Sequence, residues 1–161
     1  RVLMGTPQMH HADLPSAAAG GNRVVLQNRG QSFTAVVCHF GNPHAVIFVD
    51  DGEPMQLAQE HGPALSSLKL FPQGVNVSFV RPRGELLQTV VFERGAGITQ
   101  ACGSGACAVA VAAVGSGLRP VVSDFAVRLP GGVLQLTVDN AGAVSMEGPA
   151  AAVFQGTANA L

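Results

Sequence analysis

Apolar and polar residues alternate with a period of two along much of the chain, which is typical of strands that have one buried face. The clearest alternation covers residues 125–129, 134–138 and 144–146, and turn-forming segments at 130–132 and 139–142 separate these runs. We therefore predict an antiparallel meander in this part of the chain.

Shorter apolar runs predict further strands over residues 33–40, 45–49, 75–79 and 86–92. An Arg-Pro-Arg-Gly turn at 81–84 makes the last two a hairpin. The sheet predicted from these runs and the meander therefore contains strands from most of the chain.

Two segments have helical character. Residues 54–69 predict a helix that is broken near Gly62-Pro63, because proline removes a backbone donor. Residues 105–114 are rich in alanine and apolar on every side, so this second helix should be buried on every side. Residues 11–23 contain the small residues and glycines of a loop.

The fold class that follows is α+β, with a curved antiparallel sheet or barrel wrapped around one central apolar helix. The length of 161 residues suits a single domain over 1–161, since no repeat or linker divides the sequence.

Composition excludes several classes of protein. Charged residues make up 12% of the chain and the formal net charge is −1, so a surface for nucleic acid is not expected. The longest strictly apolar run, 106–114, is much shorter than the roughly 20 residues of a membrane-spanning helix. Three unevenly spaced cysteines argue against a disulfide framework and favour a reducing cytoplasm. Without a C-x-x-C pair or clustered histidines, we expect no metal site.

The most informative segment surrounds Cys102, which stands directly before the predicted central helix. A helix N-terminus favours negative charge, so we expect the pKa of this thiol to be lowered. The backbone amides of Gly103 and Ser104 form a nest suited to a carboxylate. Together these groups predict abstraction of the proton next to a carboxylate. The alternative is a small buried cysteine whose neighbouring glycines serve packing.

Two other interpretations of this segment are weaker. Residues 103–108 match a dinucleotide-binding G-x-G-x-x-A motif followed by Asp124, but residues 95–100 separate the motif from any preceding strand. A cysteine–histidine hydrolase with His44 as base lacks an assignable residue to orient the imidazole. Cys38 lies in an apolar strand, and Cys107 is rotated about 140° from Cys102 on a helix, so both are predicted core residues.

Five polar residues are secondary candidates: Asn42, His44, Asn76, Glu93 and Arg94. Each also has an ordinary explanation, as a turn residue, a solvent-facing strand position or a member of a surface ion pair.

Taken together, these segments resemble diaminopimelate epimerases, and specifically the C-terminal half of such enzymes. The most specific motifs are Asn-Pro-His at 42–44, Glu-Arg-Gly at 93–95 and Cys-Gly-Ser-Gly-Ala at 102–106. The resemblance runs nearly from end to end, over residues 4–7, 41–46, 62–63, 71–72, 76–77, 93–99, 101–108, 130–132 and 148–149.

The resemblance implies a fold of two similar halves, each a barrel-like sheet around a central helix, with the active site between them. The family converts LL-diaminopimelate to the meso form for lysine and peptidoglycan synthesis, with no pyridoxal phosphate, metal or other cofactor. Two cysteines act on opposite faces of the α-carbon as base and acid. Cys102 matches the second of them, and Gly103 and Ser104 match the backbone donors to the reacting carboxylate.

The remaining candidates also match positions of the family. Glu93 and Arg94 match substrate contacts, and Asn42 and Asn76 match side chains that hold the distal end of the substrate. His44 and Glu93 match positions that tune the cysteine pair.

One departure from the family is large: the Asn-x-Cys-Gly-Asn-Gly motif of the first cysteine is absent. We therefore predict that the chain alone lacks epimerase activity and pairs with the N-terminal half of the same enzyme, with a homodimer as a further assembly. A related racemase or isomerase of another amino or hydroxy acid, and a non-catalytic remnant or assembly module, remain as alternatives.

Overall fold

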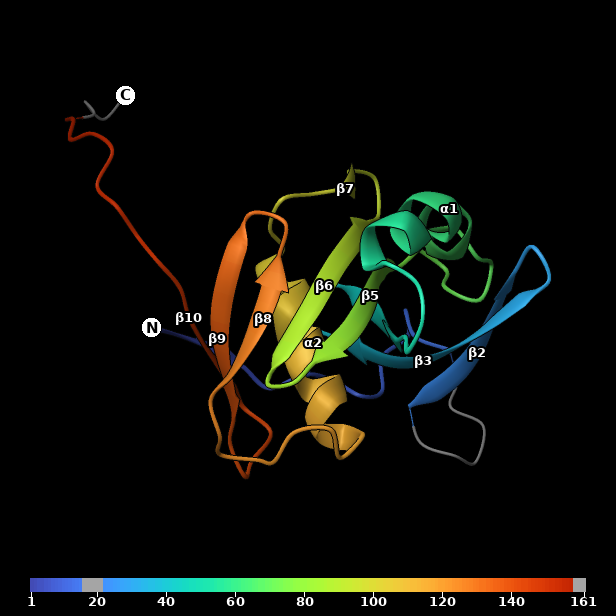
Figure 1. Cartoon of the computed structure of the whole chain (residues 1–161), viewed down its shortest axis with the longest axis horizontal. Helices are drawn as coiled ribbons and strands as arrows, with labels where there is room; N and C mark the ends of the chain where they lie inside the picture. The colour runs from blue at the N-terminus through green and yellow to red at the C-terminus, as the bar shows by residue number, and fades with distance from the viewer. Residues whose placement is uncertain (16–21, 158–161) are drawn as a thin grey trace.

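One curved sheet and two helices make up this protein in a computed structural model that describes residues 1–15 and 22–157. The elements are β1 (Val2–Gly5), β2 (Arg23–Asn28), β3 (Gln31–His39), β4 (Pro43–Phe48), α1 (Pro54–Ser66), β5 (Asn76–Arg83), β6 (Leu86–Glu93), β7 (Gly97–Ile98), α2 (Gly103–Gly115), β8 (Phe125–Leu129), β9 (Gly132–Val138) and β10 (Val144–Glu147). The strands follow the order β1-β10-β9-β8-β6-β5-β4-β3-β2, with β7 paired to β6 (Figure 1).

Two strand pairs in this sheet, β4 with β5 and β6 with β8, are parallel, and the other pairs are antiparallel. Parallel neighbours need a crossover connection, and a helix lies within each one: α1 between β4 and β5, and α2 between β6 and β8. The predicted α+β class is confirmed. The antiparallel direction predicted for the sheet fails at these two pairs, because alternation reports which face is buried and not which way a strand runs.

The central helix α2 is buried as predicted. Eight of its residues are buried, and it contacts β3 and β4 from one part of the sheet and β9 and β10 from the other. Figure 1 shows it behind β6 and β8. Alanine and valine side chains let the strands approach closely, and the predicted core cysteines Cys38 and Cys107 belong to this cluster.

A second core lies on the opposite face of the sheet, under α1. Adjacent residues of β6 separate the two cores: Val90 packs on the α1 side and Val91 on the α2 side. The sheet is therefore covered by a helix on each face around β5 and β6.

The predicted break in α1 is wrong, although the helix ends earlier than expected, at Ser66. Pro63 lies in the last turn of the helix, which ends at Ser66. The missing N–H of this proline therefore removes one backbone hydrogen bond close to the end of the helix. Gly62 is required by packing, since a Cβ atom there would lie 2.6 Å from the Phe92 ring. The helix therefore packs closely on β6 in this segment.

Three strands escaped prediction: β1, β2 and the two-residue β7. β1 and β2 lie at the two edges of the sheet, and the exposed apolar residues Leu3 and Val25 interrupt the apolar–polar alternation there. The predicted loop over 11–23 ends at Arg23, which already belongs to β2, and its residues 16–21 lie outside the described residues.

Beyond β10, residues 148–157 extend away from the body without helix or strand (Figure 1). Within the ranges 1–15 and 22–157, neither helix has the length and apolar character needed to cross a membrane.

Candidate active site

Cys102 occupies the N-cap position of α2, as predicted, with extended backbone angles (φ −141°, ψ 102°). Its carbonyl accepts the first intrahelical bond, from Ala106 N–H at 2.9 Å. The side chain is 7% exposed, and its Sγ lies 3.7 Å from Ser104 Oγ. The thiol is therefore nearly buried at the start of the central helix.

The expected fall in the pKa of Cys102 is not what the structure shows. Burial raises the pKa of this thiol above its ordinary value, and hydrogen bonds from Ser104 and the Gly105 amide lower it by less. The carboxylate of Glu93 raises it further. The position at the helix N-terminus predicted a lowered pKa because the local sequence does not contain the depth of burial, which depends on the tertiary structure.

The amides predicted to hold a carboxylate are in place beside this thiol. Gly103 and Ser104 are the first two residues of α2 and are half-buried. The first amides of a helix have no partner within the helix, so they are available to an anion.

Glu93 lies beside Cys102 because β6 ends there and the chain turns back through β7. Its Oε1 accepts a hydrogen bond from Thr99 Oγ1. The returning segment is fixed where Gly131 N–H donates to Gln100 O at 2.7 Å, a contact so close that a Cβ atom at Gly131 would lie 2.8 Å from that oxygen. Thr99 thus belongs to the site, although the sequence offered no role for it.

Asn76 and Arg94 meet at the start of β5. Asn76 is 2% exposed, and its Oδ1 accepts the backbone N–H of Arg94 at 2.9 Å. The Arg94 guanidinium donates to Gln73 O at 2.7 Å. It lines an open cavity of about 540 Å³ together with residues 66–69, residues 71–74 and Gly95. The Arg94 side chain therefore lines a cavity large enough for part of a small ligand.

His44 is fully buried in β4, opposite Asn76 in the parallel pair. Its Nε2 lies 2.8 Å from Asn42 Oδ1. Burial, with smaller contributions from the nearby His39 and Arg94, lowers the pKa of His44 to about 4, so the imidazole is neutral near pH 7.

The structure thus gathers the candidates into two groups. Cys102, Gly103 and Ser104 lie with Glu93 at the start of α2, while His44, Asn42, Asn76 and Arg94 lie around the facing ends of β4 and β5. The adjacent residues Glu93 and Arg94 join the two groups. His39, whose charge helps to lower the pKa of His44, had appeared in the sequence only as part of a strand.

One further cluster resembles a set of metal ligands. His11, Asp13 and His39 bring potential ligand atoms within 4.8 Å of one another. The two imidazoles, however, stack with centroids 3.7 Å apart and planes at 13°, so their in-plane lone pairs do not converge. His11 Nδ1 also accepts the Asp13 backbone N–H at 3.1 Å. We assign no metal to this cluster.

The curved sheet around a central helix is a fold that this chain shares with solved structures of a hydroxyproline epimerase and a probable proline racemase. A solved hydroxyproline epimerase from Agrobacterium vitis shares the fold, with a TM-score of 0.54 over 87% of this chain and 46% of that one, at 14% sequence identity.

Sequence comparison is more specific than this likeness of fold. A family model for diaminopimelate epimerase matches residues 36–153. A diaminopimelate epimerase of Bacillus cytotoxicus is 41% identical over 97% of the chain, and one of Bacillus licheniformis is 40% identical over 96%. This chain belongs to the diaminopimelate epimerase family, as its motifs predicted, and therefore to a family of enzymes. It spans about half of these relatives, 55% of the length of each.

Proposed function

We propose that this chain supplies one half of the active site of a diaminopimelate epimerase. The whole enzyme converts LL-diaminopimelate to the meso form in the cytoplasm, for lysine and peptidoglycan synthesis, without pyridoxal phosphate or metal. The observation that carries the proposal is the placement of Cys102 at the start of α2, beside Glu93 and the first backbone amides of the helix at Gly103 and Ser104, in a chain of this family.

In the proposed reaction Cys102 exchanges a proton with the α-carbon of the substrate. Because burial raises its pKa, Cys102 is a thiol near neutral pH and is prepared to donate that proton. In the opposite direction, the same burial makes its thiolate a stronger base. The amides of Gly103 and Ser104 hold the reacting carboxylate and stabilise the charge that develops on it as the C–H bond breaks.

The second group of residues fits the distal end of the substrate. Diaminopimelate carries a carboxylate and an amino group at each end. Arg94 offers a guanidinium to the distal carboxylate, and Asn42 and Asn76 offer amides to the remaining polar atoms. This second set of polar groups favours a dicarboxylic substrate over a simple amino acid.

Inversion needs a second proton-transfer group on the other face of the α-carbon. Cys38 and Cys107 do not suit this role, because burial raises the pKa of each to about 12 and both lie in the core. We propose that the N-terminal half of the same enzyme brings the second cysteine, and that the isolated chain does not turn over substrate.

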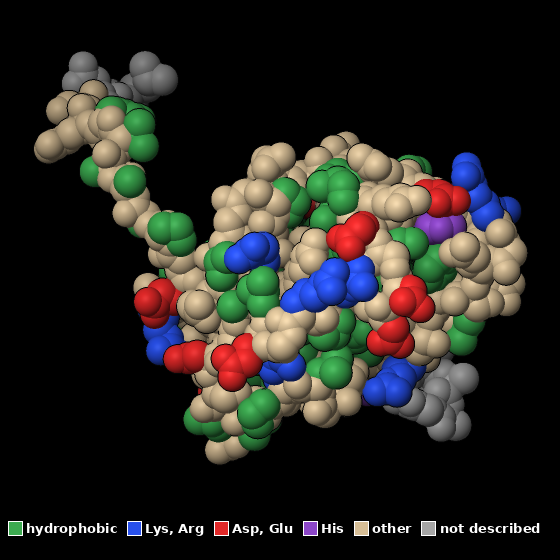
Figure 2. Space-filling model, in the orientation of Figure 1, with side chains coloured by type: hydrophobic (Ala, Val, Ile, Leu, Met, Phe, Trp, Pro, Cys, Tyr) green, Lys and Arg blue, Asp and Glu red, His purple; other side chains and the backbone are tan. Residues whose placement is uncertain are grey.

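Exposed apolar residues at one side of the molecule support such an assembly. Val2 and Leu3 on β1 are 56% and 72% exposed, and Val153 and Phe154 beyond β10 are both 89% exposed. Figure 2 shows the apolar side chains of the terminal segment standing clear of the body. A missing half, or a second copy in a homodimer, would cover them.

The proposal is tested by mixing the chain with the N-terminal half of the Bacillus cytotoxicus relative and following conversion of LL-diaminopimelate. Cys102→Ala should reduce turnover by roughly 10²- to 10⁴-fold. Cys107→Ala, which changes a core cysteine of the same helix, should leave it within a few-fold. Full activity of Cys102→Ala would overturn the role of Cys102, and preference for proline or hydroxyproline would overturn the substrate.

A further inference from the structure

The hydrogen bond between Asn42 and His44 determines which ring nitrogen of His44 carries the hydrogen. The two atoms, Asn42 Oδ1 and His44 Nε2, lie 2.8 Å apart. An amide oxygen accepts hydrogen bonds and cannot donate them, so Nε2 must carry the hydrogen. In a neutral imidazole the lone pair then belongs to Nδ1.

That Nδ1 atom is buried and, among the residues described, has no hydrogen-bond partner. Asn76 Nδ2, at the paired position on β5, is likewise buried and unpartnered in the described part of the chain. Buried polar atoms in folded proteins are nearly always paired. An acceptor and a donor left unpaired at neighbouring positions therefore point to a partner that arrives from outside.

We propose that Asn42 is a positioning residue that holds His44 in its Nε2–H tautomer, so that Nδ1 is presented to the site as a hydrogen-bond acceptor. Its own Nδ2 remains available for the substrate contact proposed above. The acceptor would receive a hydrogen bond from a donor brought by the substrate or by the partner half. That use of the acceptor rests on the proposed function, whereas the tautomer does not.

A second asparagine–histidine pair in the same chain provides a matched control. His61, also buried, lies with its Nδ1 3.0 Å from Asn28 Nδ2, so that here the amide donates. His61 belongs to α1 and Asn28 to β2, away from Cys102. This pair reports on the effect of removing an asparagine from a buried histidine outside the site.

The experiment is long-range ¹H–¹⁵N correlation of the imidazoles in the 161-residue chain at neutral pH. His44 should show the Nε2–H pattern. In Asn42→Ala the ratio of tautomers should move toward Nδ1–H by roughly two- to tenfold, the equivalent of one ordinary hydrogen bond. Asn28→Ala should change the His61 signals and leave those of His44 in place.

A conservative variant separates positioning from a structural role. Asn42→Asp keeps the accepting oxygen and so should keep the Nε2–H tautomer, while its negative charge should raise the pKa of His44 against the opposing effects of His39 and Arg94. In the enzyme assembled with the N-terminal half, the acid limb of the rate profile should therefore move to higher pH.

An Nδ1–H pattern in the unsubstituted chain would overturn the inference, as would an unchanged tautomer ratio in a folded Asn42→Ala. If the tautomer is as stated but the assembled enzyme has no epimerase activity, the proposed function fails and the positioning of His44 stands.

Discussion

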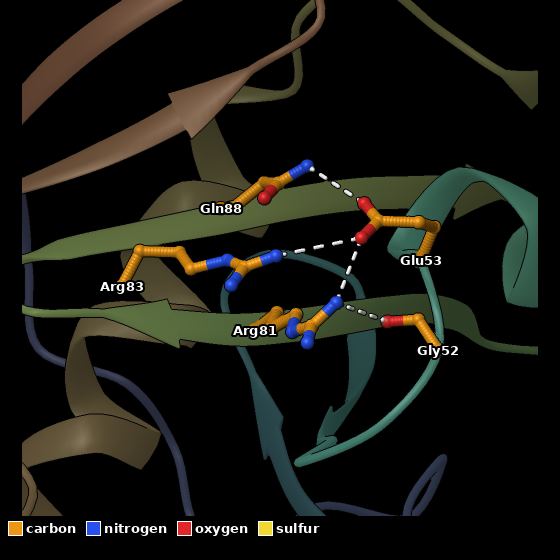
Figure 3. A network of polar contacts seen from close by, with 5 residues as sticks. All are labelled: Gly52, Glu53, Arg81, Arg83 and Gln88. Atoms are coloured by element: carbon orange, nitrogen blue, oxygen red, sulfur yellow. Dashed lines mark hydrogen bonds and ion pairs between the residues drawn. The ribbon is translucent and has the colours of Figure 1, made fainter.

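The residue before α1 is a paired carboxylate and the residue before α2 is a buried thiol, although both helices begin next to β6. Before α1, the Glu53 carboxylate accepts hydrogen bonds from Arg81 at 2.7 Å, Arg83 at 3.4 Å and Gln88 of β6 at 3.4 Å (Figure 3). The next residue, Pro54, has no N–H to satisfy. Before α2, the corresponding position is Cys102, and the residues that follow carry no charge.

This difference separates a helix start that serves stability from one that serves chemistry. At α1 the charges are paired with one another on the surface, and no reactive group remains. At α2 the amides of Gly103 and Ser104 are left available, and the thiol is buried where its pKa responds to each neighbour.

The largest difference should be between substituting Arg94 in the candidate site and substituting Arg83 in the network at α1. Arg94→Gln removes the guanidinium assigned to the distal carboxylate, so KM for diaminopimelate in the assembled enzyme should rise roughly ten- to hundredfold, as for loss of a charge-assisted hydrogen bond. Arg83→Gln, from the network at α1, should leave KM unchanged. Equal effects of the two variants in steady-state kinetics would remove the distinction between the sites.

Glycines within the two helices should respond with opposite signs. Gly62→Ala in α1 places a methyl group against Phe92 and should lower the free energy of unfolding by about 1–3 kcal/mol. Gly115→Ala in α2 has no atom within 4 Å of the new Cβ and should raise it by up to about 1 kcal/mol. Urea denaturation measures both, and a stabilised Gly62→Ala would contradict the packing described for α1.

The pH dependence of Cys102 alkylation should change when a neighbour that raises or lowers the pKa of the thiol is removed. Because its pKa lies above the ordinary value of 9.0, the rate of alkylation should still be rising at pH 9. Glu93→Gln removes a negative charge that raises the pKa, so the midpoint should move to lower pH. Ser104→Ala removes a hydrogen bond that lowers it, so the midpoint should move to higher pH. Shifts in the same direction for both variants would refute this account of the thiol.

The network at α1 should matter least. Glu53→Gln breaks two exposed ion pairs, which are worth about 0–1 kcal/mol together with their hydrogen bonds, and urea denaturation should show a loss of that size. Turnover of the assembled enzyme should not change. A loss of activity in this variant would mean that α1 and the site are coupled.

The fold was predictable where one kind of residue dominates a segment. The alanine-rich composition of 105–114 was enough for a buried central helix, and period-two alternation was enough for most strands. Strand direction was not predictable, because a strand buried on both faces, such as β4, has the same pattern whether its neighbour is parallel or antiparallel. The close packing of α1 on β6 was not predictable either, because Gly62 and Phe92 are thirty positions apart in the chain.

The residues of the candidate site were predictable from the sequence, whereas the pKa of Cys102 and the tautomer of His44 were not. The motifs named Cys102, Glu93 and His44, and the structure shows where each of them lies. The rise in the pKa of Cys102 follows from burial by residues of several strands, which no local segment contains. The tautomer of His44 follows from one hydrogen bond across a turn, which the sequence Asn-Pro-His permits but does not specify.

The most direct test of the central claim is the exchange of the α-hydrogen of LL-diaminopimelate in D₂O, with parallel detection of the meso form. We expect neither exchange nor conversion by the 161-residue chain alone, and both when the N-terminal half is supplied. Conversion to meso-diaminopimelate by the purified chain alone would contradict the claim that it carries half of an active site.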